Sequence, residues 1–252
     1  MYDLLPIWVI ATFVGALLCA ASESAWFFAQ KGETRPAEAP FEIALAPAFT
    51  LVALLLGFVF SMALGRFDAR GGAVLREANA IREVAVLTDL LDGQSALAMR
   101  QHLGDYLEAR VAFALADADP GGRLQAARNS IKNQADMRRL AVASATLHPE
   151  AGAQMLSALT TMASASAEEA AALSNYIPPA IIIMLVIISL IASALMGFQL
   201  GCRGQRGTLA GAMLAIMLAL ILGTVIDLDQ PQRGFIRVSL EPLRAVQTSI
   251  QP

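Results

Sequence analysis

Four separate stretches of this chain are long and apolar enough to cross a lipid bilayer as helices. They cover residues 4–21, 43–64, 177–200 and 208–226, and none has an ionised residue near its middle. A hydrocarbon layer of roughly 30 Å requires about 20 predominantly apolar residues in a helix. The composition agrees, because 56% of the 252 residues are hydrophobic and only 15% are charged. The sequence therefore predicts an all-α membrane protein with four transmembrane helices.

The first stretch is expected to stay in the mature protein. Its leader "MYDLL" has one Asp and no Lys or Arg, so it lacks the basic region of a signal peptide. The two cysteines, Cys19 and Cys202, lie on different segments and have neither a disulfide pattern nor a metal-ligand spacing. The sequence predicts no cofactor and no metal ion.

An even number of spans places both termini and the long 65–176 segment on one side of the membrane. Of the 18 Lys and Arg residues, only four fall in the loops 22–42 and 201–207 on the opposite side. The positive-inside tendency therefore predicts an inner-membrane protein with its termini in the cytoplasm. Four regions follow: a first helix pair (1–64), a cytoplasmic helical domain (65–176), a second helix pair (177–226) and a cytoplasmic tail (227–252).

The 65–176 segment reads as about four helices with turn signals between them. The signals are "LLDG" near 90, "DADPGG" at 117–122, "LHPE" at 147–150 and "PP" at 178, and "RGG" at 70–72 suggests a further break. Within "LAMRQHLGDYLEARVAF" the apolar residues recur at helical spacing, with Arg100, Glu108 and Arg110 on other faces. Strand-type alternation does not occur in this segment. The segment is therefore predicted to be helical.

Small residues recur every four positions on each apolar stretch. Such spacing lets helix backbones approach closely, which is how helices associate in lipid. The partner helix can lie in the same chain or in another subunit, and short ladders also arise by chance in a sequence this rich in Ala. The ladders are Ala11, Gly15, Cys19 and then Glu23; Ala53, Gly57, Ser61 and Gly65; Ser189, Ser193, Gly197 and Gly201; and Gly207, Gly211, Ala215, Ala219 and Gly223.

Charged residues follow the second and fourth stretches, at the predicted cytoplasmic boundary. The second is followed by Arg66, Asp68 and Arg70, and the fourth by Asp227 and Asp229. An ion pair between the two groups would fix the helix ends in register. Alternatively, the charges form a ring at the mouth of an ion pathway, where Arg would favour anions and Asp would favour cations.

Two further polar segments adjoin these boundaries. "REANAI" contains Arg76, Glu77 and Asn79, which are expected either to hydrogen-bond the base of the fourth helix or to form a solvated helix face. "DLDQPQRGFIRVSLEPL", which includes Arg233, predicts a fixed turn and a docked tail, because Pro and Gly restrict or permit particular backbone angles there.

Together, "GFVFSMALGRFDAR", "REANAI" and "DLDQPQRGFIRVS" closely resemble the bestrophin-like domain family of bacterial membrane proteins. The resemblance also includes Glu23, "YLEARV" at 106–111 and "PPAI" at 178–181. It implies a distant relation to bestrophins, oligomeric ion channels whose subunits have four membrane helices and a helical cytoplasmic region. A homo-oligomer, a pentamer by this resemblance, an inorganic ion as partner and a pore lined by 43–64 are then expected. The chain departs from the family pattern at Gly71 and Gly72, where the resemblance leads us to expect more basic residues.

An ion channel is therefore the first functional hypothesis, and a non-conducting scaffold or signalling protein that presents 65–176 to a partner is the alternative. The face of the second stretch that carries Val52, Leu55, Val59 and Met62 is expected to contact lipid rather than line a pore. A secondary transporter would need ionisable residues or broken helices at mid-depth, which the four stretches lack.

Enzymatic and nucleic-acid functions have little support in the sequence. His102 and His148 lack the spacing of a zinc helix, and neither a phosphate-binding loop nor a nucleophile motif is present. The adjacent Glu168 and Glu169 would point in different directions on a helix. The basic residues are scattered along the chain, so no nucleic-acid partner is expected. The partners expected are the lipid bilayer, other copies of the chain and an inorganic ion.

Overall fold

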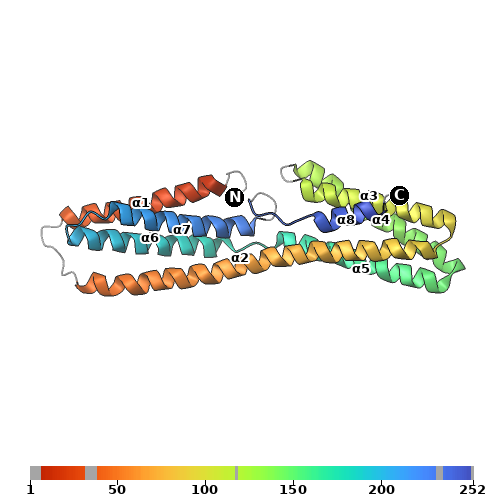
Figure 1. The fold of residues 1–252 in the computed structure, drawn as a ribbon, viewed down its shortest axis with the longest axis horizontal. Helices are drawn as coiled ribbons and strands as arrows, with labels where there is room; N and C mark the ends of the chain where they lie inside the picture. The colour runs from red at the N-terminus through yellow and green to blue at the C-terminus, as the bar shows by residue number, and fades with distance from the viewer. Residues whose placement is uncertain (1–6, 32–38, 117–118, 231–234, 251–252) are drawn as a thin grey trace. The chain divides into compact units, whose positions relative to one another are not determined.

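The structure of the protein is a computed structural model, and it describes residues 7–31, 39–116, 119–230 and 235–250. Of the described residues, 91% are helical and none lies in a strand. Figure 1 shows the order of the helices. They are α1 (Ile7–Lys31), α2 (Ala39–Leu87), the 3-10 helix η1 (Thr88–Leu90), α3 (Gly93–Leu115), α4 (Pro120–Leu147), α5 (Pro149–Ser174), α6 (Pro179–Cys202), α7 (Thr208–Asp229) and α8 (Glu241–Ile250).

Four helical stretches are long and apolar enough to cross a membrane. They are Trp8–Lys31, Ile43–Leu90, Pro149–Cys202 and Thr208–Asp229. Two of them correct the boundaries expected from sequence. The first helix does not end near residue 21 but continues through small and aromatic residues to Lys31. The break expected at "RGG" is absent, since α2 is a single helix of 49 residues that includes Gly71 and Gly72.

The helix starts follow from local chemistry at the predicted turn signals. Pro occupies the first turn of α4, α5 and α6, where its missing N–H costs no helical hydrogen bond. At the start of α3, the Asp92 side chain accepts a hydrogen bond from the Ser95 N–H at 2.8 Å. Hydrogen bonds from Ser95 lower the pKa of the Asp92 carboxyl. Asp119 caps α4 in the same way, with 3.0 Å to the Gly121 N–H.

The chain divides into two compact units, and unit 1 comprises residues 1–66 and 176–236. In it α1 packs against both α6 and α7 (Figure 1). The contacts run along the small-residue ladders. A Cβ added at Gly197 would overlap the carbonyl oxygen of Ser22, and one at Gly223 would lie 3.1 Å from the Cβ of Ala11. Backbones in unit 1 therefore meet at distances that only small residues permit.

The α2 segment of unit 1 buries a different face from the one that its small residues occupy. Val52, Leu56, Val59 and Ala63 are all at most 4% exposed. The expectation that Val52 and Val59 contact lipid is therefore wrong, because these β-branched side chains fill the interior of the helix bundle. The face that carries the small residues points away from the other described helices of unit 1.

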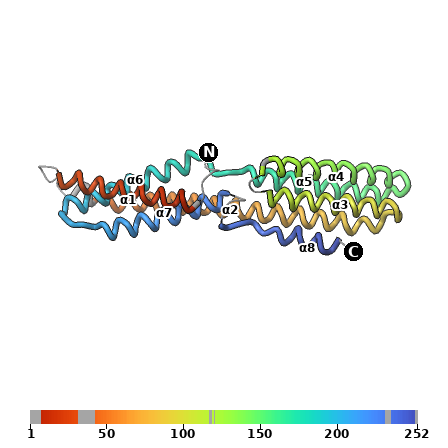
Figure 2. Tube along the Cα trace, turned by 90° about the horizontal axis from the view of Figure 1, so that it is seen from above, coloured from red at the N-terminus to blue at the C-terminus, as the bar shows by residue number. Residues whose placement is uncertain are grey.

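Unit 2 comprises residues 67–175 and 237–252. Here α3 packs against α4, and α4 against α5, as parallel rows of helices in Figure 2. The core contains long side chains, among them the fully buried Met99, Tyr106, Met137 and Met162. Helix α8 adds Leu243 and Val246 to the same core, so the tail after the fourth membrane helix is docked in unit 2.

Candidate functional site

The exposed face of α2 in unit 1 is the first candidate for a functional surface. Ala53, Gly57, Ser61 and Gly65 are all exposed in the isolated chain. No other heavy atom of the described chain lies within 4 Å of a Cβ added at Gly57 or Gly65. By contrast, Gly211 approaches the Ser22 hydroxyl and Ala215 is 2% exposed, so the α7 ladder is used inside unit 1. Among the described residues, the small-residue ladder of α2 is therefore exposed, whereas the ladder of α7 is covered.

Larger apolar residues border this ladder. Phe58 is 64% exposed and Leu54 is 54% exposed, and both lie at helical spacing from Ser61. The exposed face of α2, defined here by Ala53, Leu54, Gly57, Phe58, Ser61 and Gly65, is therefore apolar with one hydroxyl.

Two aspartates organise the C-terminal end of α7. Both carboxylate oxygens of Asp229 accept hydrogen bonds from the Ile177 N–H, at 2.9 and 3.1 Å. Arg66 at the end of the α2 segment lies 3.7 Å from an Asp229 oxygen, so an ion pair joins α2 to α7. The Nη1 atom of Arg66 is buried and has no hydrogen-bond partner among the described residues. Asp229 thus connects three segments: α2, α7 and residues 177–178, which directly precede α6.

Asp227 stabilises the turn that follows α7. Its two oxygens accept hydrogen bonds from the N–H groups of Phe235 and Ile236, at 2.9 and 3.0 Å. Asp227 is 4% exposed, so it does not reach an aqueous surface of the isolated chain. Arg233, which the sequence placed in this turn, lies outside the described residues.

The other charges at the predicted boundary have separate environments. Arg70 is 1% exposed and donates hydrogen bonds to the carbonyls of Ala172 at 3.2 Å and Asn175 at 3.1 Å, in unit 2. Asp68 is exposed on α2. Of the boundary charges of α2, the structure thus places Arg70 in a buried contact and leaves Asp68 on the surface.

Glu23 lies inside α1 rather than after it. It is exposed and lines a small cleft with Trp26 and Arg206. The Trp26 indole N–H donates to the Gln205 carbonyl at 3.0 Å, and the Arg206 guanidinium lies 5.3 Å from the centre of the Trp26 ring. These contacts tie the end of α1 to the α6–α7 loop.

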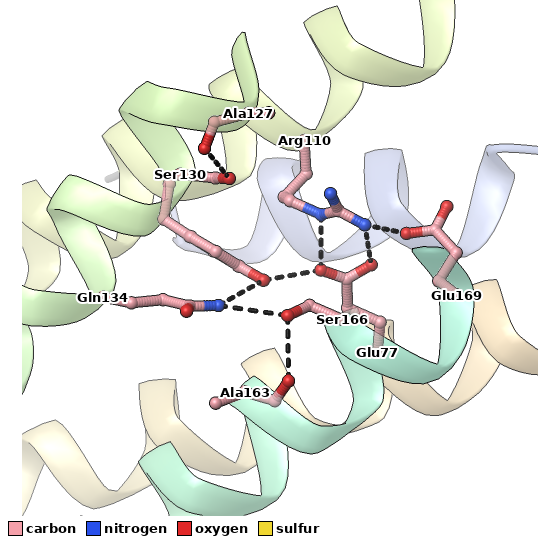
Figure 3. A network of polar contacts seen from close by, with 9 residues as sticks. Glu77, Arg110, Ala127, Ser130, Gln134, Ala163, Ser166 and Glu169 are labelled. Atoms are coloured by element: carbon pink, nitrogen blue, oxygen red, sulfur yellow. Dashed lines mark hydrogen bonds and ion pairs between the residues drawn. The ribbon is translucent and has the colours of Figure 1, made fainter. Parts of the chain in front are cut away.

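A buried polar network occupies the core of unit 2, and Figure 3 shows its members. Glu77 on α2 is 0% exposed and accepts two hydrogen bonds from Arg110 on α3, from Nε at 2.6 Å and from Nη2 at 3.0 Å. The same Nη2 atom donates to Glu169 on α5. The guanidinium of Arg110 therefore binds two carboxylates, in a region from which water is largely excluded.

Neutral groups extend the network on one side. The Tyr106 hydroxyl donates to Glu77 at 2.6 Å, and the amide of Gln134 donates to Tyr106 and to the Ser166 hydroxyl, both at 3.2 Å. Burial, followed by the negative charge of Glu77, raises the pKa of Tyr106, so this phenol stays a hydrogen-bond donor. The network joins α2, α3, α4 and α5 (Figure 3).

The network corrects two sequence expectations. Glu77 neither contacts the fourth membrane helix nor faces solvent, because it is buried and binds Arg110. Arg76 and Asn79 are exposed, which agrees with the alternative of a solvated helix face, and Arg76 lies 3.0 Å from Glu168. Asn79 accepts from Arg82 on its own helix. Arg110, placed away from the apolar face, is 6% exposed. Its position three residues after Leu107 and seven after Leu103 is the signal that could have identified it as buried.

The sequence matches the profile of the Bestrophin-like domain over residues 11–243. None of the curated proteins matches the chain. A crystal structure of a mutant bacterial bestrophin homolog from Klebsiella pneumoniae has 16% sequence identity and a TM-score of 0.64, over 97% of this chain and 95% of that one. Another structure of the Klebsiella pneumoniae homolog, phased with zinc, has 15% identity and a TM-score of 0.65, over 96% and 95% of the two chains.

These likenesses show the fold of a bestrophin homolog, and the profile match covers nearly the whole chain. The expected relation, read from "GFVFSMALGRFDAR", "REANAI" and "DLDQPQRGFIRVS", is confirmed. So is the all-helical membrane fold with four spanning helices. The protein is a membrane protein with the fold of a bestrophin homolog, and it belongs to the bestrophin-like family.

Proposed function

We propose that this protein is a subunit of a homo-oligomeric ion channel in the bacterial inner membrane, with the exposed face of α2 along the ion pathway. The observation that carries the proposal is the uncovered ladder of α2. The glycines of the other membrane helices contact a neighbouring helix or loop residue of the same chain, whereas Gly57 and Gly65 contact none of the described residues outside their own helix. In an assembled channel this face would meet other copies or the ions themselves.

The orientation follows the charge distribution. Fourteen Lys and Arg residues lie on the side of the termini and of unit 2, against four on the other side, so unit 2 is cytoplasmic in this proposal. The pentameric state is carried over from the family resemblance alone.

The ion preference follows from which boundary charge is accessible. Arg66, Asp227 and Asp229 are used within unit 1 as anchors. Asp68 is exposed and lies three residues after Gly65, on the same side of α2 by helical spacing. An acidic side chain repeated around the axis of an oligomer would attract cations. The proposal therefore includes a preference for cations over anions.

The test begins with purified protein in planar bilayers, with ion substitution and a mass measurement in detergent. A single cysteine is then placed at Ser61 in a variant that lacks Cys19 and Cys202. Reaction with a charged thiol reagent is expected to block most of the current. The matched control is a cysteine at Leu220 on α7, which is 64% exposed but lies on another helix, and its reaction should leave the current unchanged.

Charge reversal at Asp68 should move the reversal potential toward anion permeation. A monomeric protein without current would contradict the proposal and leave the scaffold alternative, in which the membrane helices only present unit 2 to a partner. Equal block at Ser61 and Leu220 would also contradict it, because the pathway would then not follow α2.

A further inference from the structure

The exposed side of α3 combines acidic and apolar residues. Asp105 and Glu108 lie near its middle, and Leu97 and Leu115, each more than half exposed, lie toward its two ends. Their spacing places all four on one side of the helix. We call this surface the α3 face, and it consists of Leu97, Gln101, Asp105, Glu108, Ala112 and Leu115.

The exposed side of α4 has the opposite charge. Arg128 and Lys132 flank Ile131 in the sequence, and Leu124 and Val142 lie toward the two ends of the helix. The three apolar side chains are more than half exposed. Large apolar side chains that gather on an exposed surface within a polar rim are typical of an interaction site. We call this surface the α4 face, and it consists of Leu124, Arg128, Ile131, Lys132, Ala135 and Val142.

The four charged side chains of the two faces are available to a partner. Among the described residues, none of the four takes part in an ion pair. Asp105, Glu108 and Lys132 line a cleft of about 540 Å³ between α3 and α4, together with the small Ala109 and Ala126. Opposite charges therefore border an open cleft without binding one another.

The packing of α3 against α4 sets the register of the two faces. The Nδ1 atom of His102 lies 3.3 Å from the Asn133 Oδ1 atom, and the amide of Gln134 donates to the Tyr106 hydroxyl at 3.2 Å. The two helices run in opposite directions from these contacts. Counted along each helix, Arg128 lies level with Glu108, Lys132 with Asp105, Leu124 with Leu115 and Val142 with Leu97, all within about one helical turn of 5.4 Å.

Copies of the chain that share one membrane have the same orientation in it. Rotation about the membrane normal relates them, so each residue keeps its depth from one copy to the next. The α3 helix of one copy is therefore antiparallel to the α4 helix of its neighbour and in the same register. Glu108 then lies beside the partner's Arg128, and Asp105 beside the partner's Lys132.

We propose that the α3 face of one copy docks on the α4 face of a neighbouring copy. Opposite charges meet in the middle of the contact, and exposed leucines and valine meet at its two ends. The partner is a second copy rather than a different protein because both faces belong to this chain and match in charge and in the order of their residues. The inference rests on the proposed function, in which copies assemble in one membrane.

The first experiment cross-links single cysteines in the full-length protein without Cys19 and Cys202. Leu115→Cys and Leu124→Cys are made in two differently tagged copies, which are produced together in the same membrane. A short bismaleimide should join the two tags, because the two positions meet across the contact. The matched control pairs Leu115→Cys with Leu147→Cys, since Leu147 is also more than half exposed but lies at the far end of α4. This pair should give no product.

The second experiment reverses charges in the same cross-linking pair. Glu108→Arg in the copy with Leu115→Cys brings two cations together and should lower the yield of cross-linked product at least about tenfold. Arg128→Glu in the copy with Leu124→Cys should restore the yield, because the two charges are then exchanged. Both side chains are exposed, so neither substitution disturbs the core.

The outcomes separate this inference from the proposed channel. A conducting oligomer that gives no cross-link, or that cross-links equally at Leu147, would overturn the inference and leave the channel. Failure of the charge exchange to restore the yield would also overturn it. A cross-link that follows the charge exchange in a protein without current would support the inference and contradict the channel. A protein that is monomeric in detergent and gives no cross-link in the membrane would contradict both.

Discussion

The two units pack their helices by different means. In unit 1, Gly201 lies so close to α1 that a Cβ would come within 2.7 Å of the Trp26 carbonyl oxygen. In unit 2, long side chains such as Met99 and Met155 fill the space between helices, and ionised groups are buried among them. This difference agrees with the proposed function, in which unit 1 lies in lipid and unit 2 in water. Burial of apolar side chains stabilises packing little in lipid but strongly in water.

The same contrast governs how each unit treats charge. Unit 1 keeps Arg66, Asp227 and Asp229 at one end of its helices, where they bind backbone N–H groups or each other. Unit 2 places Glu77 and Arg110 in the middle of its core. Substitutions in the two units should therefore differ in size and in cause.

The largest effect is expected from Arg110→Met. The change leaves Glu77 and Glu169 buried side by side without their shared cation, which costs about 3–5 kcal/mol of folding free energy when one partner of a buried ion pair is removed. The measurement is an unfolding titration of the purified protein, compared with Arg76→Met. Because Arg76 and Glu168 are both 57% exposed, that control should change the free energy of unfolding by at most about 1 kcal/mol. If Arg110→Met and Arg76→Met lowered the free energy of unfolding equally, the buried and the exposed ion pairs would contribute equally to stability.

Gly197→Ala should produce the next largest loss. The added methyl group overlaps the carbonyl of Ser22, and backbone atoms cannot move aside as a flexible side chain can. Overpacking of this kind costs about 1–3 kcal/mol. Thermal unfolding in detergent measures the loss. If the midpoint does not change, α1 and α6 can separate at no cost, and close backbone contact does not stabilise unit 1.

Asp229→Asn should weaken unit 1 by a smaller amount, about 1 kcal/mol, which is typical of one lost hydrogen bond. The amide keeps one acceptor oxygen for the Ile177 N–H but loses the second acceptor and the charge opposite Arg66. Ion preference of the channel should stay unchanged, since Asp229 is an anchor in the proposed function. A shift in reversal potential without a loss of stability would instead place Asp229 at the pathway.

Sequence reasoning found the fold because the strongest signals were local. Four apolar runs and Pro or Asp at helix starts predicted most helices, as α4, α5 and α6 show. It placed a break at Gly71 and Gly72 because glycine disfavours helix interiors. The continuous α2 shows that packing outweighs this preference, since Val74, Ala78 and Ile81 beyond the glycines are buried in the core of unit 2.

The buried network was beyond sequence reasoning because its members come from separate helices. Glu77 and Arg110 are 33 positions apart, and Arg110 and Glu169 are 59 apart. Periodicity can show that a charged residue lies on an apolar face, but it does not identify the partner across the core. The sequence also did not show which face of α2 is buried, because small residues and β-branched residues both occur on buried helix faces.

The smallest effect on folding is expected from Gly57→Ala, because Gly57 belongs to the exposed small-residue ladder of α2 and contacts no other described helix of unit 1. No neighbouring atom of the described chain lies within 4 Å of the added methyl group, and alanine is favoured over glycine in a helix interior by about 0.5–1 kcal/mol. The protein should therefore be as stable as the wild type or slightly more stable. Gly57→Trp should likewise leave the monomer folded but should disturb assembly or conduction, as judged by mass in detergent and by bilayer current. If a folded Gly57→Trp protein assembles and conducts like the wild type, the exposed face of α2 contacts only lipid, and the small residues there have no role in the channel.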